Sequence, residues 1–322
     1  MTEPYLAHGV TLALAWFLIV NASTSIGAAA VGSWRLSARE RPSGFWFLLR
    51  LSPAILSAFF VLALFLPSYW RYEPSNTAEG FDVTLTGFAL VAIALIGSGC
   101  VRGASAWIRA RRRARVWMRS ARPLGVYSGM RAVEVDADFP LMALVGIVSP
   151  RLIVTAPLVA ALSGDEMQAA IAHEIAHRSA LDNLKRLLIR LTPDVLGATA
   201  AARAIERQWV AAAEQAADNR AGGDDPTMRC ALASALVKVA RLTPSSTPPR
   251  SLEPVSTLVD GGDITARVER LLDDRAAAST AAPRRVRLYA AMLVSVAAIA
   301  AGYSASLVTI HDATETLVQL LP

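Results

Sequence analysis

A short stretch, AHEIAHRSALDN, begins at Ala172 and places two histidines four positions apart, with a glutamate directly after the first. Residues four apart on an α-helix project from the same face, so His173 and His177 can bind one zinc ion together. Glu174 reaches the edge of such a site and can take a proton from an attacking water as the general base. The metal makes that water acidic near neutral pH and polarises a carbonyl. The stretch therefore predicts one Zn²⁺ per chain and a hydrolytic reaction, rather than two histidines spaced by chance.

A catalytic zinc site needs a third protein ligand besides these two imidazoles. The other histidines, His8 and His311, fall outside the membrane in the topology described below, so the third ligand is predicted to be a carboxylate or absent. Glu214 is the favoured carboxylate, because it lies in an alanine-rich segment that is typical of a closely packed helix. Asp218 follows at i+4 on the same face and can accept the N–H of a ligand imidazole. The alternative interpretation of Glu214 is a solvated acid on a helix surface.

Two further residues have roles that the sequence leaves open. Asp182 comes five residues after His177, and it either orients that histidine or caps the next helix. The group that stabilises the oxyanion is not evident. Arg220 or a tyrosine is a candidate, and Arg220 is equally well placed to pair with Asp218.

Capping signals indicate the helices that must position these residues. Ser163 is followed three positions later by Glu166, which is the spacing of a capping box and predicts a helix over about Gly164–Ser179. An amphipathic helix that ends near Pro193 follows it. A third helix is predicted over about 200–221, where two glycines stop it.

Weaker patterns flank these helices. Short apolar pieces before the motif predict strands, of which Leu152–Thr155 is the favoured one. The segment Leu242–Ser256 is rich in proline and serine and predicts a linker. The sequence ITARVERLLDD, after that linker, favours a short helix.

The composition favours a membrane protein, because 54% of the 322 residues are hydrophobic, more than one soluble core of this length needs. A helix that crosses about 30 Å of hydrocarbon takes roughly 20 mostly apolar residues. Four stretches pass this test, at about Val10–Val31, Phe45–Pro67, Phe81–Val101 and Val286–Ile310. The first is predicted to be a retained span rather than a signal peptide, because Glu3 and no basic residue precedes it.

The arginines predict the orientation, since short cytoplasmic loops carry the excess of basic residues. They cluster between the first two stretches, directly after the third and directly before the fourth. The region from about residue 102 to residue 287 is therefore predicted to be cytoplasmic, with both termini outside. Arg50 lies near the cytoplasmic end of the second stretch, and its charge is predicted to reach the interface by snorkelling.

Eight arginines between Arg102 and Arg122 raise the question of nucleic acid, because basic clusters neutralise phosphates. Their place directly after a membrane span favours contact with anionic lipid and a role in setting the topology. We therefore predict the lipid bilayer as a partner and no direct binding of nucleic acid.

Three segments, AHEIAHRSALDNLKRLL, EQAADNRA and ITARVERLL, resemble sequences of the membrane-bound gluzincins, the first two through the HExxH and ExxxD motifs. The order of three spans, a cytoplasmic domain and a returning span is similar to the BlaR/MecR-type signal-transducing metallopeptidases. The resemblance implies a zinc endopeptidase with His173, His177 and Glu214 as ligands and Glu174 as general base. It also implies a cytoplasmic substrate, such as a BlaI-like winged-helix repressor. A further implication is a substrate-pairing edge strand formed by Leu152, Ile153, Val154 and Thr155.

The chain departs from those transducers after its last span. About 12 residues follow it, too few for a penicillin-binding sensor domain, and no SxxK motif lies there, so acylation by a β-lactam is not expected. The first alternative is an HtpX-like quality-control protease, a type that typically has spans between HExxH and the third ligand. Here 36 residues broken by arginines separate His177 from Glu214, which favours the BlaR/MecR-like interpretation. The second alternative is a non-catalytic membrane receptor that contains a zincin domain.

Together these features predict an α-helical membrane protein with four transmembrane helices and an inserted cytoplasmic α+β zincin domain of the minigluzincin type. The predicted divisions are three spans in residues 1–102, the peptidase domain in 103–285, and the fourth span with a short outer tail in 286–322. The preference for arginine over lysine, with abundant alanine, is typical of a high-GC bacterium and predicts the inner membrane. The predicted activity is regulated proteolysis of a repressor or of the chain itself, and oligomerisation through the spans stays open.

Overall fold

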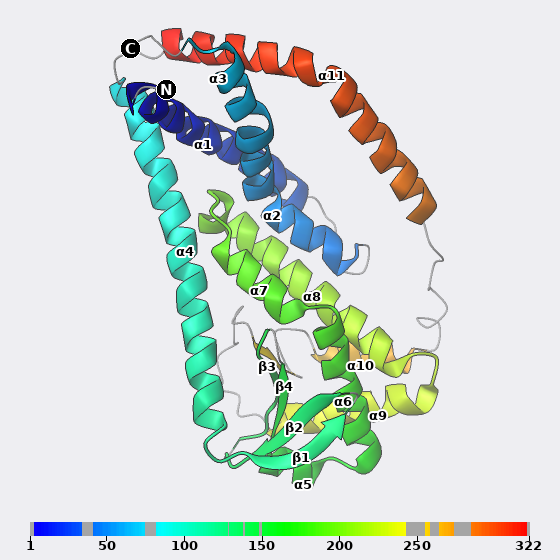
Figure 1. Cartoon of the computed structure of the whole chain (residues 1–322). Coiled ribbons are helices and arrows are strands. Elements are labelled where there is room, and N and C mark those ends of the chain that lie inside the picture. The colour runs from blue at the N-terminus through cyan, green and yellow to red at the C-terminus, as the bar shows by residue number, and fades with distance from the viewer. Residues whose placement is uncertain are drawn as a thin grey trace.

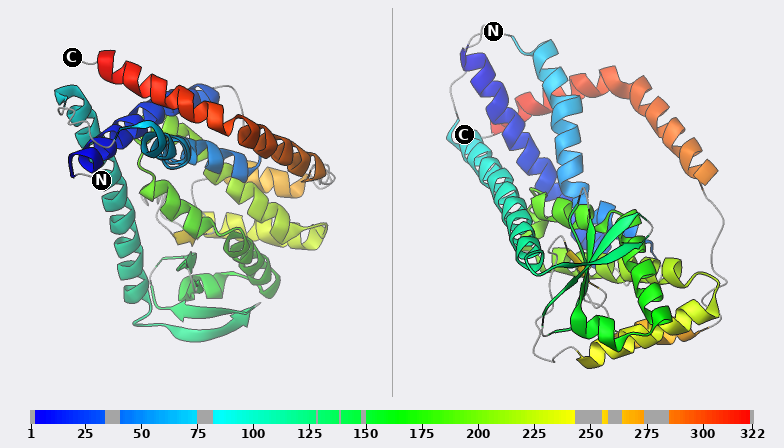
Figure 2. Two further views of the ribbon diagram at one scale, coloured as in Figure 1. Left: turned by 45° about the horizontal axis from the view of Figure 1, so that its top comes forward. Right: turned by 60° about the horizontal axis from the view of Figure 1, so that its bottom comes forward.

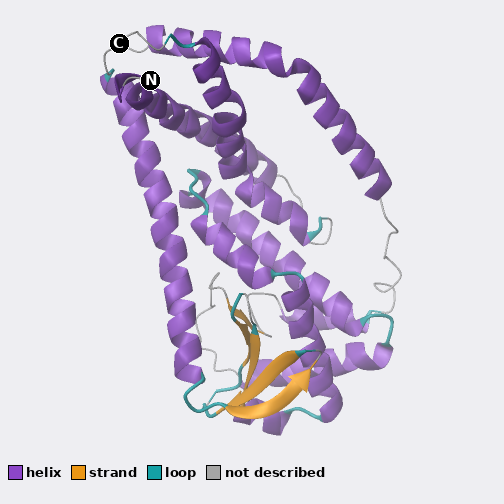
Figure 3. Ribbon diagram, in the orientation of Figure 1, coloured by secondary structure: helices purple, strands orange, loops and turns teal. Residues whose placement is uncertain are grey.

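The computed structural model describes residues 3–33, 41–74, 82–127, 129–137, 139–147, 150–242, 255–257, 264–273 and 285–320. Long helices gather at one end, and a small sheet with its covering helices lies at the other (Figures 1 and 3). The helix α4 runs from these long helices to the sheet, as both views in Figure 2 show.

Among the described residues, three helices are long and apolar enough to cross a membrane, and they coincide with the first three predicted stretches. The first is α1 (Glu3–Ser33). The second consists of α2 (Ser43–Phe59), a π-helical segment (Phe60–Phe65) and α3 (Leu66–Tyr72), which follow one another without a gap. The third is α4 (Val83–Trp117).

The fourth predicted stretch falls in α11, a helix over Arg285–Leu320. The side chains of residues 285–301 lie outside the described set, and the three helices above are the candidate spans among the described residues. The later part of α11 is bound to the second helix, because Ser68 Oγ donates to the Leu307 carbonyl at 2.6 Å and Tyr303 Oη donates to the Ala63 carbonyl at 2.7 Å. A fourth span therefore stays a prediction.

The sheet has five strands in the order β1-β2-β4-β3-β5. Strands β2 and β4 pair in parallel, and the other neighbouring pairs are antiparallel. The strands are β1 (Arg122–Tyr127), β2 (Met130–Val135), β3 (Met142–Val145), β4 (Arg151–Thr155) and β5 (Val255–Thr257).

The prediction that Leu152–Thr155 forms an edge of the sheet is wrong. These residues form a strand, but β4 is hydrogen-bonded to β2 on one side and to β3 on the other. All four residues are buried, which is usual for an interior strand with both faces covered. The predicted linker Leu242–Ser256 overlaps an edge strand only at its last two residues, because Val255–Thr257 pairs with β3 as β5. Residues 243–254 of that prediction lie outside the described residues.

The two faces of the sheet pack against different helices. Leu152 and Val154 pack with α6 (Gly164–Ser179) and α9 (Pro226–Leu242). On the opposite face, Ile153 packs with residues of α4. Since successive side chains of a strand point to opposite faces, both layers contact the same strand. The predicted division between residues 102 and 103 falls inside α4, which is both a candidate span and a cover of the sheet.

The remaining helices agree with the sequence signals around the motif. The helix α6 has the predicted bounds, α7 ends before Pro193, and α8 ends at the first of the two glycines. The segment ITARVERLL forms the predicted short helix. The bounds of these elements are α5 (Ala156–Ala161), α7 (Asp182–Leu191), a 3₁₀ turn (Leu196–Ala198), α8 (Ala200–Gly222) and α10 (Ile264–Leu272).

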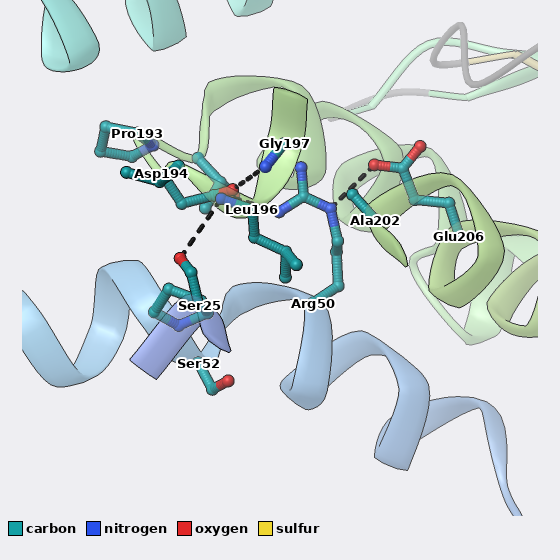
Figure 4. A network of polar contacts seen from close by, with 12 residues as sticks. Ser25, Arg50, Ser52, Pro193, Asp194, Leu196, Gly197, Ala202 and Glu206 are labelled. Atoms are coloured by element: carbon teal, nitrogen blue, oxygen red, sulfur yellow. Dashed lines mark hydrogen bonds and ion pairs between the residues drawn. The ribbon is translucent and has the colours of Figure 1, made fainter. Parts of the chain in front are cut away.

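Arg50 of α2 does not snorkel, and that prediction is wrong. Its side chain is 3% exposed, with Nη1 2.7 Å from Asp194 Oδ2 and Nε 2.8 Å from Glu206 Oε1 (Figure 4). The two carboxylates belong to the connection between α7 and α8 and to α8 itself. These carboxylates balance the charge of the buried guanidinium, as water does for a snorkelling arginine. Both lie far from Arg50 along the chain, so the sequence did not indicate them.

The connection between α7 and α8 is also hydrogen-bonded to α1. Asn21 Nδ2 donates to the Pro193 carbonyl at 3.0 Å, and Asn21 Oδ1 accepts from the Val195 N–H at 3.0 Å. The Leu196 N–H donates to Ser25 Oγ at 3.2 Å (Figure 4). These bonds attach the connection between α7 and α8 to α1, which is the first candidate span.

Candidate metal centre

The two histidines of the motif lie on α6, and the cap of this helix forms as the sequence predicts. Ser163 Oγ accepts from the Glu166 N–H at 3.3 Å, and the Glu166 carboxylate accepts from the Ser163 N–H at 2.7 Å. The helical spacing brings the Nε2 atoms of His173 and His177 to 3.1 Å, and both imidazoles are buried.

Glu214 of α8 faces these two imidazoles. Its Oε2 lies 3.5 Å from His173 Nε2, and its Oε1 lies 3.4 Å from His177 Nε2. One donor atom from each of the three residues lies within 4.8 Å of the other two. Ala213 and Ala217, beside Glu214, are buried small residues, and α8 is in contact with α6. The three residues can therefore hold one metal ion.

Each imidazole is oriented through its other nitrogen. His173 Nδ1 lies 3.0 Å from Asp218 Oδ1, and His177 Nδ1 lies 2.7 Å from Asp182 Oδ2. A carboxylate at Nδ1 keeps the proton on that nitrogen and leaves the Nε2 lone pair available. Both Nε2 lone pairs and the Glu214 carboxylate then converge on one region. This donor set fits Zn²⁺, which binds two imidazoles and one carboxylate in many catalytic sites.

Arg267 of α10 binds the carboxylates of this centre and was not identified from the sequence. Its Nη1 lies 3.0 Å from Glu214 Oε2, and its Nη2 lies 2.6 Å from Asp218 Oδ1. The available signal was its position four residues before the buried Leu271, on the apolar face of an amphipathic helix. A basic residue on such a face indicates a buried acidic partner.

Arg220 does not pair with Asp218, so the carboxylate-pairing interpretation of Arg220 is wrong. Its side chain is exposed, and Nη1 donates to the Ala176 carbonyl at 3.1 Å. Asp218 is bound by Arg267 instead, from an element that the sequence did not place near it. A role of Arg220 at the oxyanion stays a prediction.

Glu174 is fully buried beside the two imidazoles. Neither of its carboxylate oxygens has a hydrogen-bond partner among the described residues. Burial raises the pKa of Glu174 above its ordinary value, and the neighbouring His177 and His173 oppose that rise only in part. A carboxyl with a raised pKa is suited to exchange a proton with a reactant near neutral pH.

The carboxylates also determine the charge of the ligand residues. Burial alone lowers the pKa of His177, but Glu214 and Asp182 outweigh it and raise that pKa to about 10. Burial raises the pKa of Glu214, but Arg267 together with His177 and His173 outweighs burial and holds that pKa well below its ordinary value. Glu214 is therefore anionic, and a metal ion that binds here competes with a proton on His177.

A cavity of about 140 Å³ borders His177 at the end of β3 and the start of α7. Leu181 joins α6 to α7 in a left-handed conformation, with φ of 57°, and this reversal brings the start of α7 back toward His177. Asn183 Nδ2 donates to the carbonyls of Leu144 at 2.9 Å and Gly146 at 3.0 Å. Asn183 thereby fixes the wall of the cavity, a role that the sequence did not indicate.

The model of peptidase family M48 matches residues 109–246 of the chain. The matched segment contains the three converging donors His173, His177 and Glu214, together with the buried Glu174. Peptidases of this family are zinc-dependent, so the match is consistent with a zinc metallopeptidase. No curated protein sequence is similar enough to the chain to count as a match.

Proposed function

We propose that the chain is an integral-membrane zinc endopeptidase. The match to peptidase family M48 supports the class of enzyme, and the three apolar helices support insertion in a membrane. The observation that carries the proposal is the convergence of His173, His177 and Glu214, which are buried side chains from two helices. Each of the three also has a charged partner that keeps its donor atom in place.

In this proposal His173, His177 and Glu214 would hold Zn²⁺, and the ion, when bound, would supply polarisation of the scissile carbonyl. Glu174 accepts a proton from the attacking water and then delivers it to the leaving amine. The raised pKa that burial gives this carboxyl makes it a better acceptor for the first of these transfers. Asp218 and Asp182 orient the imidazoles, so each Nε2 points toward the metal.

The proposed substrate is a cytoplasmic protein. Arginines follow the apolar part of α4, and this pattern supports a cytoplasmic location of the sheet and its helices. A BlaI-like repressor or the chain itself is the regulated substrate, and an HtpX-like quality-control protease is the alternative. Of the described strands, β5 is the edge strand that contacts α6 and α7. An extended substrate therefore pairs with β5 or takes its place on β3.

The test compares zinc-loaded full-length chain in detergent with two matched variants, on an unfolded protein such as casein and on a BlaI-like repressor. Glu174→Gln removes the proton acceptor at nearly constant volume, and Glu269→Gln changes an exposed glutamate of α10. We expect Glu174→Gln to retain zinc and to lose about 10²–10⁴-fold in kcat, while Glu269→Gln cleaves like the wild type.

Equal cleavage by Glu174→Gln and the wild type would show that this centre is not catalytic and would favour a zincin-containing receptor. Cleavage of the repressor at one position supports the regulated protease. Cleavage of casein alone supports the quality-control type.

A further inference from the structure

A second cluster of metal-ligating side chains lies on helices that the metal centre does not use. Glu73 directly follows α3, and His311 and Glu315 are four residues apart on α11, so they share one face of that helix. One donor atom of each lies within 4.8 Å of the other two, and His311 Nδ1 is 3.9 Å from Glu73 Oε2. The end of α3 and the C-terminal part of α11 lie at the end of the molecule opposite the strands (Figure 1).

The position of α11 beside α3 is fixed by contacts on both sides of His311 along the helix. The ring of Tyr72 lies 5.7 Å from the imidazole of His311, tilted by 34°. Trp16 Nε1 donates to Thr314 Oγ1 at 3.1 Å, one turn after His311. The Leu307 carbonyl, one turn before it, accepts the hydrogen bond from α3 described above. The face of α11 that meets Glu73 is therefore set by packing, and the cluster does not depend on one flexible side chain.

The charges of the cluster favour a cation. The side chain of Glu73 is 6% exposed, and Glu315 brings a second carboxylate to the same half-buried place. Two like charges a few ångströms apart repel strongly where little water screens them. A divalent cation bound between the two carboxylates removes this repulsion.

The donor types indicate which cations fit. Calcium and magnesium take oxygen ligands, whereas an imidazole with two carboxylates suits Zn²⁺ and similar transition-metal ions. Bonds of about 2.0–2.2 Å in a tetrahedral zinc site place the ligand atoms about 3.3–3.6 Å apart. The separation of 3.9 Å between His311 Nδ1 and Glu73 Oε2 lies close to this range, and rotation of the glutamate side chains can bring the donors together.

We propose that Glu73, His311 and Glu315 form a second divalent-metal site, which takes a zinc-class cation and joins the end of α3 to α11. The site uses none of the residues of the centre on α6 and α8, and it does not depend on the proposed peptidase activity. Its occupancy sets how firmly the last helix is held against the second candidate span.

The experiment counts the zinc ions that the full-length chain retains in detergent after saturation and removal of free zinc. We expect two per wild-type chain, one for His311→Ala, one for His173→Ala, and none for the double variant. Glu315→Gln preserves size and is expected to weaken the second site by more than about 100-fold, since a ligand is lost rather than a residue that supports one. Asp312→Asn, an exposed acid on the next position of α11, is the matched control and is expected to retain both ions.

A wild-type chain that retains a single zinc, lost on His173→Ala, overturns the proposal. Retention of two ions by both His311→Ala and Glu315→Gln overturns it as well. Glu315→Gln alone carries the test if circular dichroism shows that His311→Ala is unfolded.

Discussion

Asp218 contacts two charged groups at once, and this double contact links the ligands of the metal centre. Its Oδ1 lies near both His173 Nδ1 and Arg267 Nη2, and Arg267 in turn contacts Glu214. Because all four side chains are buried, each charge is stabilised by a neighbouring charged group rather than by water. Asp218 therefore acts on a bound metal through other side chains, directly through His173 and through Arg267 on Glu214. Its removal should change metal affinity more than the shape of the site.

We expect Asp218→Asn to weaken zinc binding at the α6–α8 centre by about 10- to 100-fold, which is the usual effect of losing a carboxylate behind a ligand imidazole. The measurement is a titration against a competing chelator in the His311→Ala background, which isolates this centre. Asp224→Asn is the control, because Asp224 is an exposed acid just after α8. Equal zinc affinity of Asp218→Asn and the wild type would refute the orienting role of Asp218.

The elements around the centre were predictable to different degrees. The bounds of α6 follow from local signals, because Ser163 and Glu166 cap the helix within four residues of each other. The position of β4 in the sheet does not follow from local signals. An apolar run indicates a buried strand but does not show which strands pair with it. The strand β5 and the helix α10 reach the centre across a long sequence separation, so neither the pairing with β3 nor the inward position of Arg267 was indicated.

The cap of α6 gives a pH-dependent contribution to stability. Burial alone raises the pKa of Glu166, but hydrogen bonds from Lys238, Ser234 and the Ser163 N–H outweigh it and lower that pKa to about 2 from 4.5. The contribution is therefore complete above about pH 4.5 and is lost as the pH falls toward 2. We expect Glu166→Gln to cost about 1–2 kcal/mol at pH 7.

The check is denaturant unfolding of the wild type and Glu166→Gln in detergent between pH 7 and pH 3. The difference in unfolding free energy should narrow steadily below about pH 4.5. Asp165→Asn, an exposed acid in the same first turn, should cost only a few tenths of a kcal/mol. A difference that stays constant down to pH 3 would contradict the assignment to ionised Glu166.

The contact of α4 with α7 depends on the absence of a side chain at Gly99. A Cβ at this position would lie 2.6 Å from the Leu191 carbonyl oxygen and 3.3 Å from backbone atoms of Pro193. We expect Gly99→Ala to destabilise the chain by about 1–3 kcal/mol, because backbone cannot move aside cheaply. Gly97→Ala meets nothing within 4 Å and should be neutral or slightly stabilising. Thermal unfolding in detergent compares the two, and equal melting temperatures would argue against the close contact.

At the scale of the whole molecule, the metal centre is attached to the candidate spans by polar contacts. Arg50 of α2 binds Asp194 and Glu206, and Glu206 lies on α8 two turns before Glu214. The helix α4 begins among the spans and ends on the sheet. The sequence indicated both parts of the molecule but not this contact. The apolar neighbours of Arg50 in sequence favoured an arginine at the lipid interface, since its two partners lie more than a hundred residues away. The architecture therefore places α8, the helix that carries the proposed ligand Glu214, in direct contact with the candidate spans.

We expect Arg50→Met to destabilise the chain by about 3–5 kcal/mol, because it leaves the buried Asp194 without a counter-charge. The connection between α7 and α8 should then become sensitive to limited proteolysis. Arg71→Met is the control, because Arg71 is exposed near the end of α3. An Arg50→Met chain as stable and protected as the control would show that the contact does not hold the two parts together.

We infer that Glu214, far from the HExxH motif in sequence, completes the metal centre from α8. The most direct measurement is the zinc content and hydrolytic rate of Glu214→Gln, beside wild type and the exposed Glu269→Gln. We expect Glu214→Gln to lose one zinc equivalent per chain and its hydrolysis together, while Glu269→Gln keeps both. A Glu214→Gln chain that retains its full zinc content and its activity would show that Glu214 is not a ligand of the centre.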